Sequence, residues 1–129
     1  MAGSKSDYLE NQLLDHVLRN VGYTPPATVY VALFTIAPGE AGGGTEVTGG
    51  SYVRQAITFG AAAAGVSSNS AQVTFPVATA DWGTVVAAAV FDAATGGNQL
   101  YYGTLSASKT ILTNDQFILP VGGVTITED

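Results

Sequence analysis

The longest uninterrupted hydrophobic run of the chain spans residues 85–91 and is bounded by a glycine and an aspartate. A run of this length with such flanks predicts a strand that is buried on both faces. Its consecutive alanines add little bulk, so a second layer could approach closely. Residues 93–98 are rich in glycine and asparagine, which reach positive φ at little steric cost and predict a turn. Residues 99–105 then return as a strand, so we expect an antiparallel hairpin over 85–105.

Near the N-terminus the hydrophobic residues follow a helical spacing instead. One stripe holds Leu9, Leu13, Val17 and Val21, with Leu14 and Leu18 beside it. Asp7 and Glu10 form an approximate capping box, while an asparagine and a glycine after the stripe favour a helix end. We therefore expect a polar arm over residues 1–6 and a helix over 7–21. A helix this short is unstable alone in water, so its stripe is expected to pack on the chain's own sheet or on a neighbouring subunit.

The rest of the chain alternates short apolar segments with glycine-rich or polar ones. Strands are predicted at 28–35, 52–59, 72–75, 110–112, 116–119 and 124–127, with a turn at 106–109. The segment at 52–59 is expected to be half-buried, with Val53, Ile57 and Phe59 on one face and Arg54 and Thr58 on the other. Loops are expected at 37–50 and 61–69, and Trp82 is expected to close one end of the core.

This succession of one helix and many short strands predicts a mainly β fold. We expect a single domain over residues 1–129, built as a β-sandwich or flattened barrel of about seven or eight short antiparallel strands with one N-terminal α-helix. The sandwich would occupy residues 28–127 and carry the long glycine-rich loop at 37–50. The sequence contains no internal repeat and no sustained coiled-coil heptads.

The composition supports a folded chain and argues against several classes of partner. Hydrophobic residues make up 47% of the 129 residues and charged residues only 11%, unlike a disordered acidic tail, despite a net charge of −6. The 4 basic residues are scattered, so we expect no nucleic-acid partner. No apolar stretch reaches the ~18 residues of a membrane span, so we expect no membrane partner, and the polar first residues argue against a signal peptide. The absence of cysteine excludes disulfides and thiolate metal sites.

Candidate catalytic groups are sparse. His16 is the only histidine, and no nucleophile motif accompanies it. The glycines at 42–44 lack the Lys-Ser/Thr ending of a phosphate-binding loop. Glu40 and Glu46 in the long loop, or the aspartates that bracket the central strand, would suit a glycosidase only if two of them flanked one cleft. We therefore expect no enzyme activity, no catalytic residue and no cofactor.

Two binding alternatives involve polar side chains of the central hairpin. Asp92, Thr95 and Asn98 could offer oxygen atoms to calcium, although such residues more often cap their own turn, and we expect no metal. Tyr101 and Tyr102 point to opposite faces of their strand. One of them is expected in the core and the other at the surface, where a partner or a sugar could meet it.

Several segments together carry a resemblance to a known family. They are SDYLEN at 6–11, LDHVLRN at 14–20, TVYVALF at 28–34, TEVTGG at 45–50, YVRQ at 52–55, ADWGTV at 80–85 and FDAATGGN at 91–98. In these the chain resembles small structural proteins of tailed bacteriophages that are usually labelled tail-fibre-like. Asn114-Asp115 stands where the family pattern has a Gly-Asp turn, and it keeps a turn former. No catalytic or ligand-binding residue comes with the resemblance.

The resemblance implies a virion structural protein that is assembled in the cytoplasm of the bacterial host. We favour a capsid decoration or cement protein, which bridges and stabilises capsomers of the major capsid protein by non-covalent contacts, because the chain lacks the repeats or heptads of a fibre shaft. The alternatives are a tail or tail-fibre component that contacts the host and a carbohydrate-binding module.

In the favoured mechanism, the N-terminal arm and the loop at 37–50 reach neighbouring subunits. We expect a cyclic homo-oligomer, with a trimer as one candidate. The candidate interface residues are Ser4, Lys5, Tyr8, Glu40, Gly43, Glu46 and Tyr102.

Overall fold

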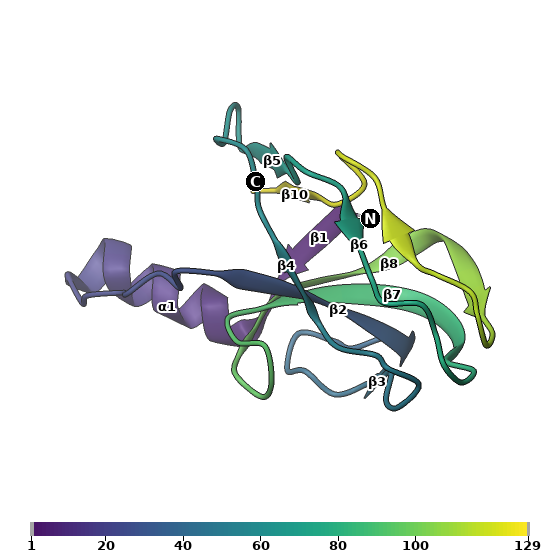
Figure 1. Cartoon of the computed structure of the whole chain (residues 1–129). Helices are drawn as coiled ribbons and strands as arrows, with labels where there is room; N and C mark the ends of the chain where they lie inside the picture. The colour runs from purple at the N-terminus through teal and green to yellow at the C-terminus, as the bar shows by residue number, and fades with distance from the viewer. Residues whose placement is uncertain (1, 129) are drawn as a thin grey trace.

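The computed structural model describes residues 2–128, which form a mainly β fold with one helix (Figure 1). The elements are β1 (Ala2–Lys5), α1 (Asp7–Arg19), β2 (Val29–Ile36), β3 (Thr45–Glu46), β4 (Gln55–Ile57), β5 (Val66–Ser68), β6 (Val73–Thr74), β7 (Gly83–Phe91), β8 (Gln99–Ile111), β9 (Ile118–Leu119) and β10 (Thr125–Thr127). The predicted fold class is confirmed. No helix within the described residues is both long and apolar enough to span a bilayer.

The strands form one large sheet and one small sheet (Figure 1). The large sheet has the order β3-β2-β7-β8-β1-β10-β5 with β4 also paired to β2, and the small sheet pairs β6 with β9. The predicted hairpin is confirmed, because β7 and β8 pair antiparallel with Ala89 opposite Tyr102. The predicted turn at 106–109 is wrong. Strand β8 continues past an irregularity in the register and pairs Lys109 with Val85. The polar residues therefore form a bulge within the strand, and the chain does not reverse there.

The main core contains residues of both sheets and is built around Phe75, which has no exposed surface. The Phe75 ring meets those of Trp82 and Phe117 edge-on, with centroids 6.4 and 5.7 Å apart. The indole N–H of Trp82 donates a hydrogen bond of 2.9 Å to the carbonyl oxygen of Gly50. Trp82 therefore belongs to the core as predicted, and its one polar atom is paired despite burial.

Strands β2 and β7 are largely buried on both faces, as the long hydrophobic run predicted for β7. Val31 and Leu33 belong to the main core. A smaller cluster on the opposite face consists of Ala32, Phe34, Ala87 and Ala89, with the half-buried Phe91 and Tyr102 packed against it. The small alanine side chains leave room on this face for the loop at 37–50 and the start of α1.

The polar arm expected over residues 1–6 is a strand where the structure describes it; residue 1 lies outside the described residues. Strand β1 lies between β8 and β10, with Ser4 opposite Tyr102 and an antiparallel register on that side. On its other side, β1 runs parallel to β10. Two neighbouring strands thus satisfy backbone groups that would otherwise be unpaired. Because these residues complete the large sheet, they are not a free arm that reaches a neighbour.

Helix α1 is capped at both ends by its own sequence. The Ser6 hydroxyl accepts a hydrogen bond of 3.2 Å from the backbone N–H of Leu9, as an N-cap residue does. Asn20 adopts a left-handed conformation (φ 56°), and its N–H donates to the carbonyl oxygen of Asp15. The helix therefore ends at Arg19, two residues before the predicted end, because asparagine tolerates the left-handed region well.

The two predicted loops contain short strands. Within 37–50, β3 pairs with β2, and the backbones of Gly39 and Gly42 bridge each other. Within 61–69, β5 pairs with β10. The predicted strand at 52–59 is shortened to β4, where Ile57 is buried as expected but Val53 is 56% exposed, because it precedes the paired segment.

Candidate interaction surfaces

The first candidate surface is a row of exposed apolar residues on α1, which we call the helix face. It consists of Leu14, Val17, Leu18 and Val21, which are 56%, 73%, 73% and 41% exposed. Their spacing of three and four residues places them on one side of the helix and its C-terminal cap. Of the stripe and its flanking leucines, Leu9 alone is buried. Packing on the chain's own sheet, one of the two partners expected for the stripe, therefore does not extend to the helix face.

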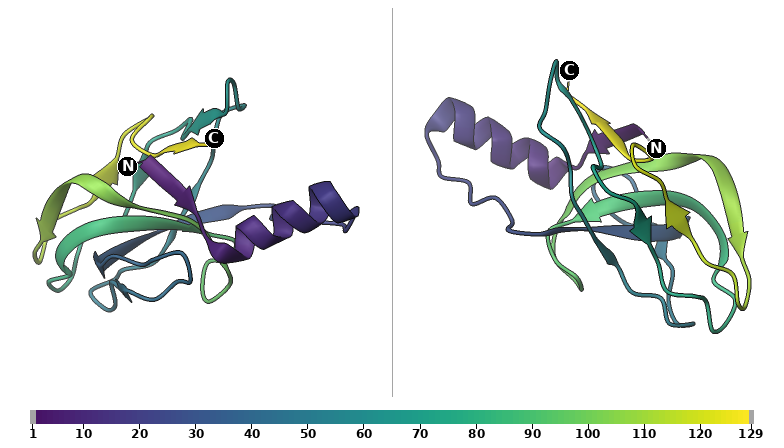
Figure 2. Two further views of the ribbon diagram at one scale, coloured as in Figure 1. Left: turned by 180° about the vertical axis from the view of Figure 1, so that it is seen from behind. Right: turned by 45° about the horizontal axis from the view of Figure 1, so that its top comes forward.

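The position of α1 explains this exposure. The helix is fixed at its first turn, where the N–H groups of Ser6 and Asp7 each donate a 2.9 Å hydrogen bond, to the carbonyl oxygens of Leu100 and Glu40. Beyond that turn it extends away from both sheets, accompanied by the segment 20–28 that returns toward β2 (Figure 2). His16 is exposed, and its Nδ1 lies 2.9 Å from the carbonyl oxygen of Val21. The helix face thus meets no other element of the described chain along most of its length.

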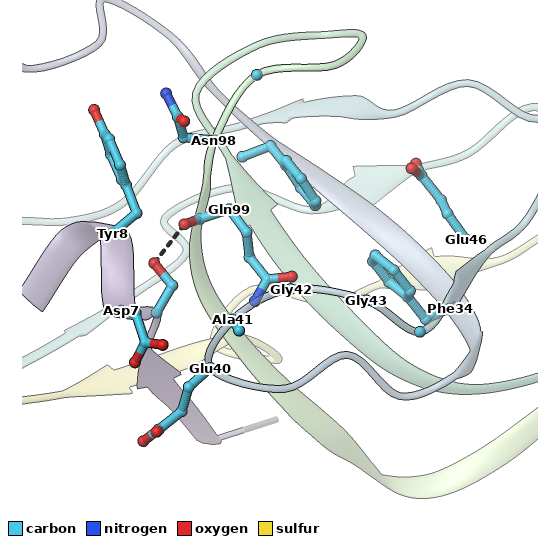
Figure 3. A pocket seen from close by; sticks show the side chains of 14 residues that line it. Asp7, Tyr8, Phe34, Glu40, Ala41, Gly42, Gly43, Glu46, Asn98 and Gln99 are labelled. Atoms are coloured by element: carbon cyan, nitrogen blue, oxygen red, sulfur yellow. Dashed lines mark hydrogen bonds between the residues drawn. The ribbon is translucent and has the colours of Figure 1, made fainter.

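The second candidate surface is a hollow of about 590 Å³ between the start of α1, the loop at 39–44 and the turn at 92–98 (Figure 3). Its floor is on the second face of the sheet, where Phe34 and Phe91 stack with ring centroids 6.3 Å apart. The remaining lining residues are Ser6, Asp7, Tyr8, Glu40, Ala41, Gly42, Gly43, Gly44, Glu46, Gly97, Asn98 and Gln99. We refer to this feature as the hollow.

The structure brings together four of the seven residues that the sequence suggested for an interface. Tyr8, Glu40, Gly43 and Glu46 all line the hollow. The other three, Ser4, Lys5 and Tyr102, lie on the neighbouring strands β1 and β8. Lys5 forms an ion pair with Glu128, which joins β1 to the end of the β10 segment. These residues therefore surround one region, although Ser4 and Lys5 belong to a strand and not to the expected polar arm.

Glu46 is held in a network inside the molecule. Its carboxylate accepts hydrogen bonds of 2.9 Å from Arg54 Nε and Nη2 and one of 2.6 Å from the Tyr52 hydroxyl. Burial alone would raise the pKa of Glu46, but the hydrogen bonds from Arg54 and Tyr52 and the charge of Arg54 outweigh it, so the pKa is lowered. For Tyr52, burial and the bond to Glu46 raise the pKa. The Glu46 carboxylate therefore stabilises the wall of the hollow and is already paired within the chain.

Arg54 extends this network to the turn at 92–98. One terminal nitrogen donates to the carbonyl oxygens of Ala93 (3.0 Å) and Gly96 (2.8 Å), and the guanidinium lies 3.8 Å from the centre of the Phe91 ring. The Arg54 side chain is only 8% exposed. Sequence alternation placed it on the open face of a strand, and no local signal marked its partners in the turn, because these lie about 40 residues away.

Gln99 was predicted only as the first residue of a strand, yet it lines the hollow. It is 9% exposed, and its side-chain amide donates a 2.8 Å hydrogen bond from Nε2 to the carbonyl oxygen of Gly39. No hydrogen bond to its Oε1 occurs within the described chain, where every fully buried side-chain oxygen has a partner. Oε1 is therefore open to the hollow, beside the glycines of the loop (Figure 3).

Three carboxylates near the start of α1 make no ion pair and no side-chain hydrogen bond within residues 2–128: Asp7, Glu10 and Glu40. Burial, together with their combined negative charge, raises the pKa of Tyr102. Asp7 and Glu40 line the hollow, whereas Glu10 lies outside it. The open side of the hollow is therefore acidic and rich in hydrogen-bond acceptors.

The other carboxylates that the sequence singled out are engaged elsewhere. Both oxygens of Asp92 accept bonds from Asn98, at 2.7 Å from the backbone N–H and 3.0 Å from the side-chain amide, so Asp92 closes its own turn. Asp81 accepts two bonds from Thr113. Within residues 2–128, no group of three or more histidine, aspartate or glutamate side chains is placed to hold a metal ion.

A family model matches the chain. The model of a family described as "Podophage GP4 fiber I protein gp80" matches residues 4–127, which is nearly the whole chain. No curated protein sequence matches the chain significantly. The matched span includes the helix face and every residue that lines the hollow.

Proposed function

The chain belongs to this family of podophage fibre proteins and is thus a virion structural protein, and on that premise we propose that it is a building unit of a tail fibre. The family description favours this alternative over the capsid decoration or cement role that the sequence led us to prefer. Because the chain lacks heptads and repeats, a fibre made from it would be held together by surface contacts between compact domains and not by a coiled-coil shaft of this chain.

The helix face is the observation that carries the proposal. Burying one exposed leucine or valine contributes about 1.5–3 kcal/mol, so four such residues offer several kcal/mol to an interface. Monomeric soluble proteins seldom leave an apolar row of this kind uncovered, and such a row marks a contact surface. We infer that α1 docks against a neighbouring fibre subunit, with a second copy of the chain as the first candidate. This role needs no catalytic residue, cofactor, nucleic acid or membrane.

The docking role is tested by placing a charge on the helix face. We expect Val17→Asp to shift the protein to a smaller species in size-exclusion chromatography with light scattering, without loss of the folded circular-dichroism spectrum. Gln12→Glu is the matched control, because it adds the same charge on the side of the helix opposite the helix face. An unchanged mass for both variants, with wild type already monomeric, would remove self-association from the proposal.

Copy number distinguishes the fibre from the head. Quantitative mass spectrometry of purified virions would give the ratio of this chain to the major capsid protein. A small number of copies per particle is expected for a fibre, whereas a ratio near one or a simple fraction of one would favour the capsid decoration role.

A further inference from the structure

The hollow has the chemistry of a site for a ligand that donates many hydrogen bonds. Its volume of about 590 Å³ lies within the range of small-molecule sites, ~300–1,000 Å³. The open polar groups include the Gln99 Oε1 and the carboxylates of Asp7 and Glu40, all of which accept hydrogen bonds. A ligand that pairs with these atoms must present hydroxyl or amine groups.

The Gln99 acceptor is preorganised. Its amide nitrogen is fixed on the Gly39 carbonyl oxygen at 2.8 Å, and the side chain is nine-tenths buried, so the amide cannot turn away from the hollow. The N-cap bond network lies directly beside it, because the Ser6 hydroxyl donates to the carbonyl oxygen of Gln99 itself. An acceptor held open in this way costs little ordering entropy when a ligand binds.

The loop wall keeps the hollow accessible. Gly42 and Gly43 have φ values of 94° and 79°, and a Cβ atom at either position would point into open space. Glycine is favoured there because other residues rarely adopt this conformation. The backbone can therefore approach a ligand closely. Tyr8 stands on the opposite side of the opening from Glu46 and offers an aromatic ring and a hydroxyl (Figure 3).

From this arrangement we propose that the hollow binds a sugar ring that is neutral or carries an amine. Sugar hydroxyls match the acceptor-rich wall, and a ring C–H face suits the Tyr8 side chain. The free carboxylates of Asp7 and Glu40 disfavour uronic and sialic acids, because like charges repel at close range. The inference does not depend on where the protein sits in the virion, so it can fail while the proposed fibre role stands.

The test is a nitrogen-15 NMR titration of the full chain with galactose, glucosamine and glucuronic acid. We expect galactose or glucosamine to shift the signals of Gly42, Gly43, Asn98 and the Gln99 side-chain amide, with a dissociation constant of about 1 mM. Glucuronic acid is expected to bind at least tenfold more weakly. Glu40→Gln should weaken binding of the preferred sugar about tenfold, because it removes a charged acceptor.

Glu10→Gln is the matched control, since Glu10 is also a free carboxylate near the start of α1 but does not line the hollow. It should leave sugar binding unchanged. The proposal is overturned if none of the sugars shifts these signals, if glucuronic acid binds as well as galactose, or if Glu10→Gln and Glu40→Gln act alike. Shifts produced only by a lysine-rich peptide would identify the hollow as an acidic docking surface for protein instead.

Discussion

Leu33 and Leu18 have the same side chain but opposite exposure to solvent. Leu33 in β2 has no exposed surface and lies in the main core, whereas Leu18 in α1 is 73% exposed on the helix face. Hydrophobic residues of the sheets stabilise the fold, while those of the helix face are exposed and, in the role proposed above, contact another molecule. The two regions therefore separate stability from assembly, and substitutions in each should affect one property and spare the other.

The largest loss of stability is expected from Leu33→Ala. Removing a fully buried leucine leaves a cavity in the main core and typically costs about 2–5 kcal/mol. Urea unfolding followed by tryptophan fluorescence would measure the change through Trp82, which belongs to the same cluster. A loss of stability below about 1 kcal/mol would mean that the core relaxes around the site. The core and the helix face would then not differ in their contribution to stability.

A somewhat smaller loss is expected from Arg54→Met, which removes the charge but keeps much of the length. The variant leaves the Glu46 carboxylate without its ion pair and the carbonyl oxygens of Ala93 and Gly96 without their donor. We expect the free energy of unfolding, measured with urea, to fall by about 2–4 kcal/mol. If the turn at 92–98 is released, its amide signals should also shift in NMR spectra; unchanged signals would contradict the fastening role of Arg54.

The same network predicts a dependence on pH. The pKa of Glu46 is below its ordinary value of 4.5 in the folded chain, so the unfolded chain binds the proton more readily. This stabilisation is therefore complete above about pH 4.5 and is lost as the pH falls through the folded pKa. Urea midpoints of wild type and Glu46→Gln should converge as the pH is lowered below 4.5. A constant difference across that range would show that the network does not titrate.

The smallest change in stability is expected from Leu18→Ala. Alanine is a better helix former than leucine, and the substitution removes little buried surface. The free energy of unfolding should therefore change by no more than about 0.5 kcal/mol. Association should weaken nevertheless, which light scattering over a concentration series would measure. Stability lost on the scale of Leu33→Ala would mean that the helix face is covered within the chain in solution.

Features with a strong local period were predictable from the sequence. The strand at 85–91 was found because a short apolar run between turn formers has few other structures available. Strand β1 was missed because its residues are small or polar, and its partners lie about 100 residues away. Removing residues 2–5 would therefore take a strand from the large sheet.

The candidate surfaces were predictable only in part. The periodicity of α1 found the apolar stripe, but the placement of the helix relative to the sheet depends on tertiary contacts that periodicity does not encode. Four expected interface residues do line the hollow, yet Glu46 turned out to be engaged with Arg54. The role of Gln99 depends on a contact 60 residues away, which no local motif reveals.

Strand β1 also decides how the molecule would respond to tension. Helix α1 is joined through Ser6 to β1 and through the segment 20–28 to β2, so part of a pull on a docked helix enters the body along β1. The hydrogen bonds from β1 to β8 and β10 run across the strand on both sides. Such a pull loads them together in shear instead of peeling them one at a time. The short strand that joins the two ends of the chain is thereby placed as the mechanical anchor of the protruding helix.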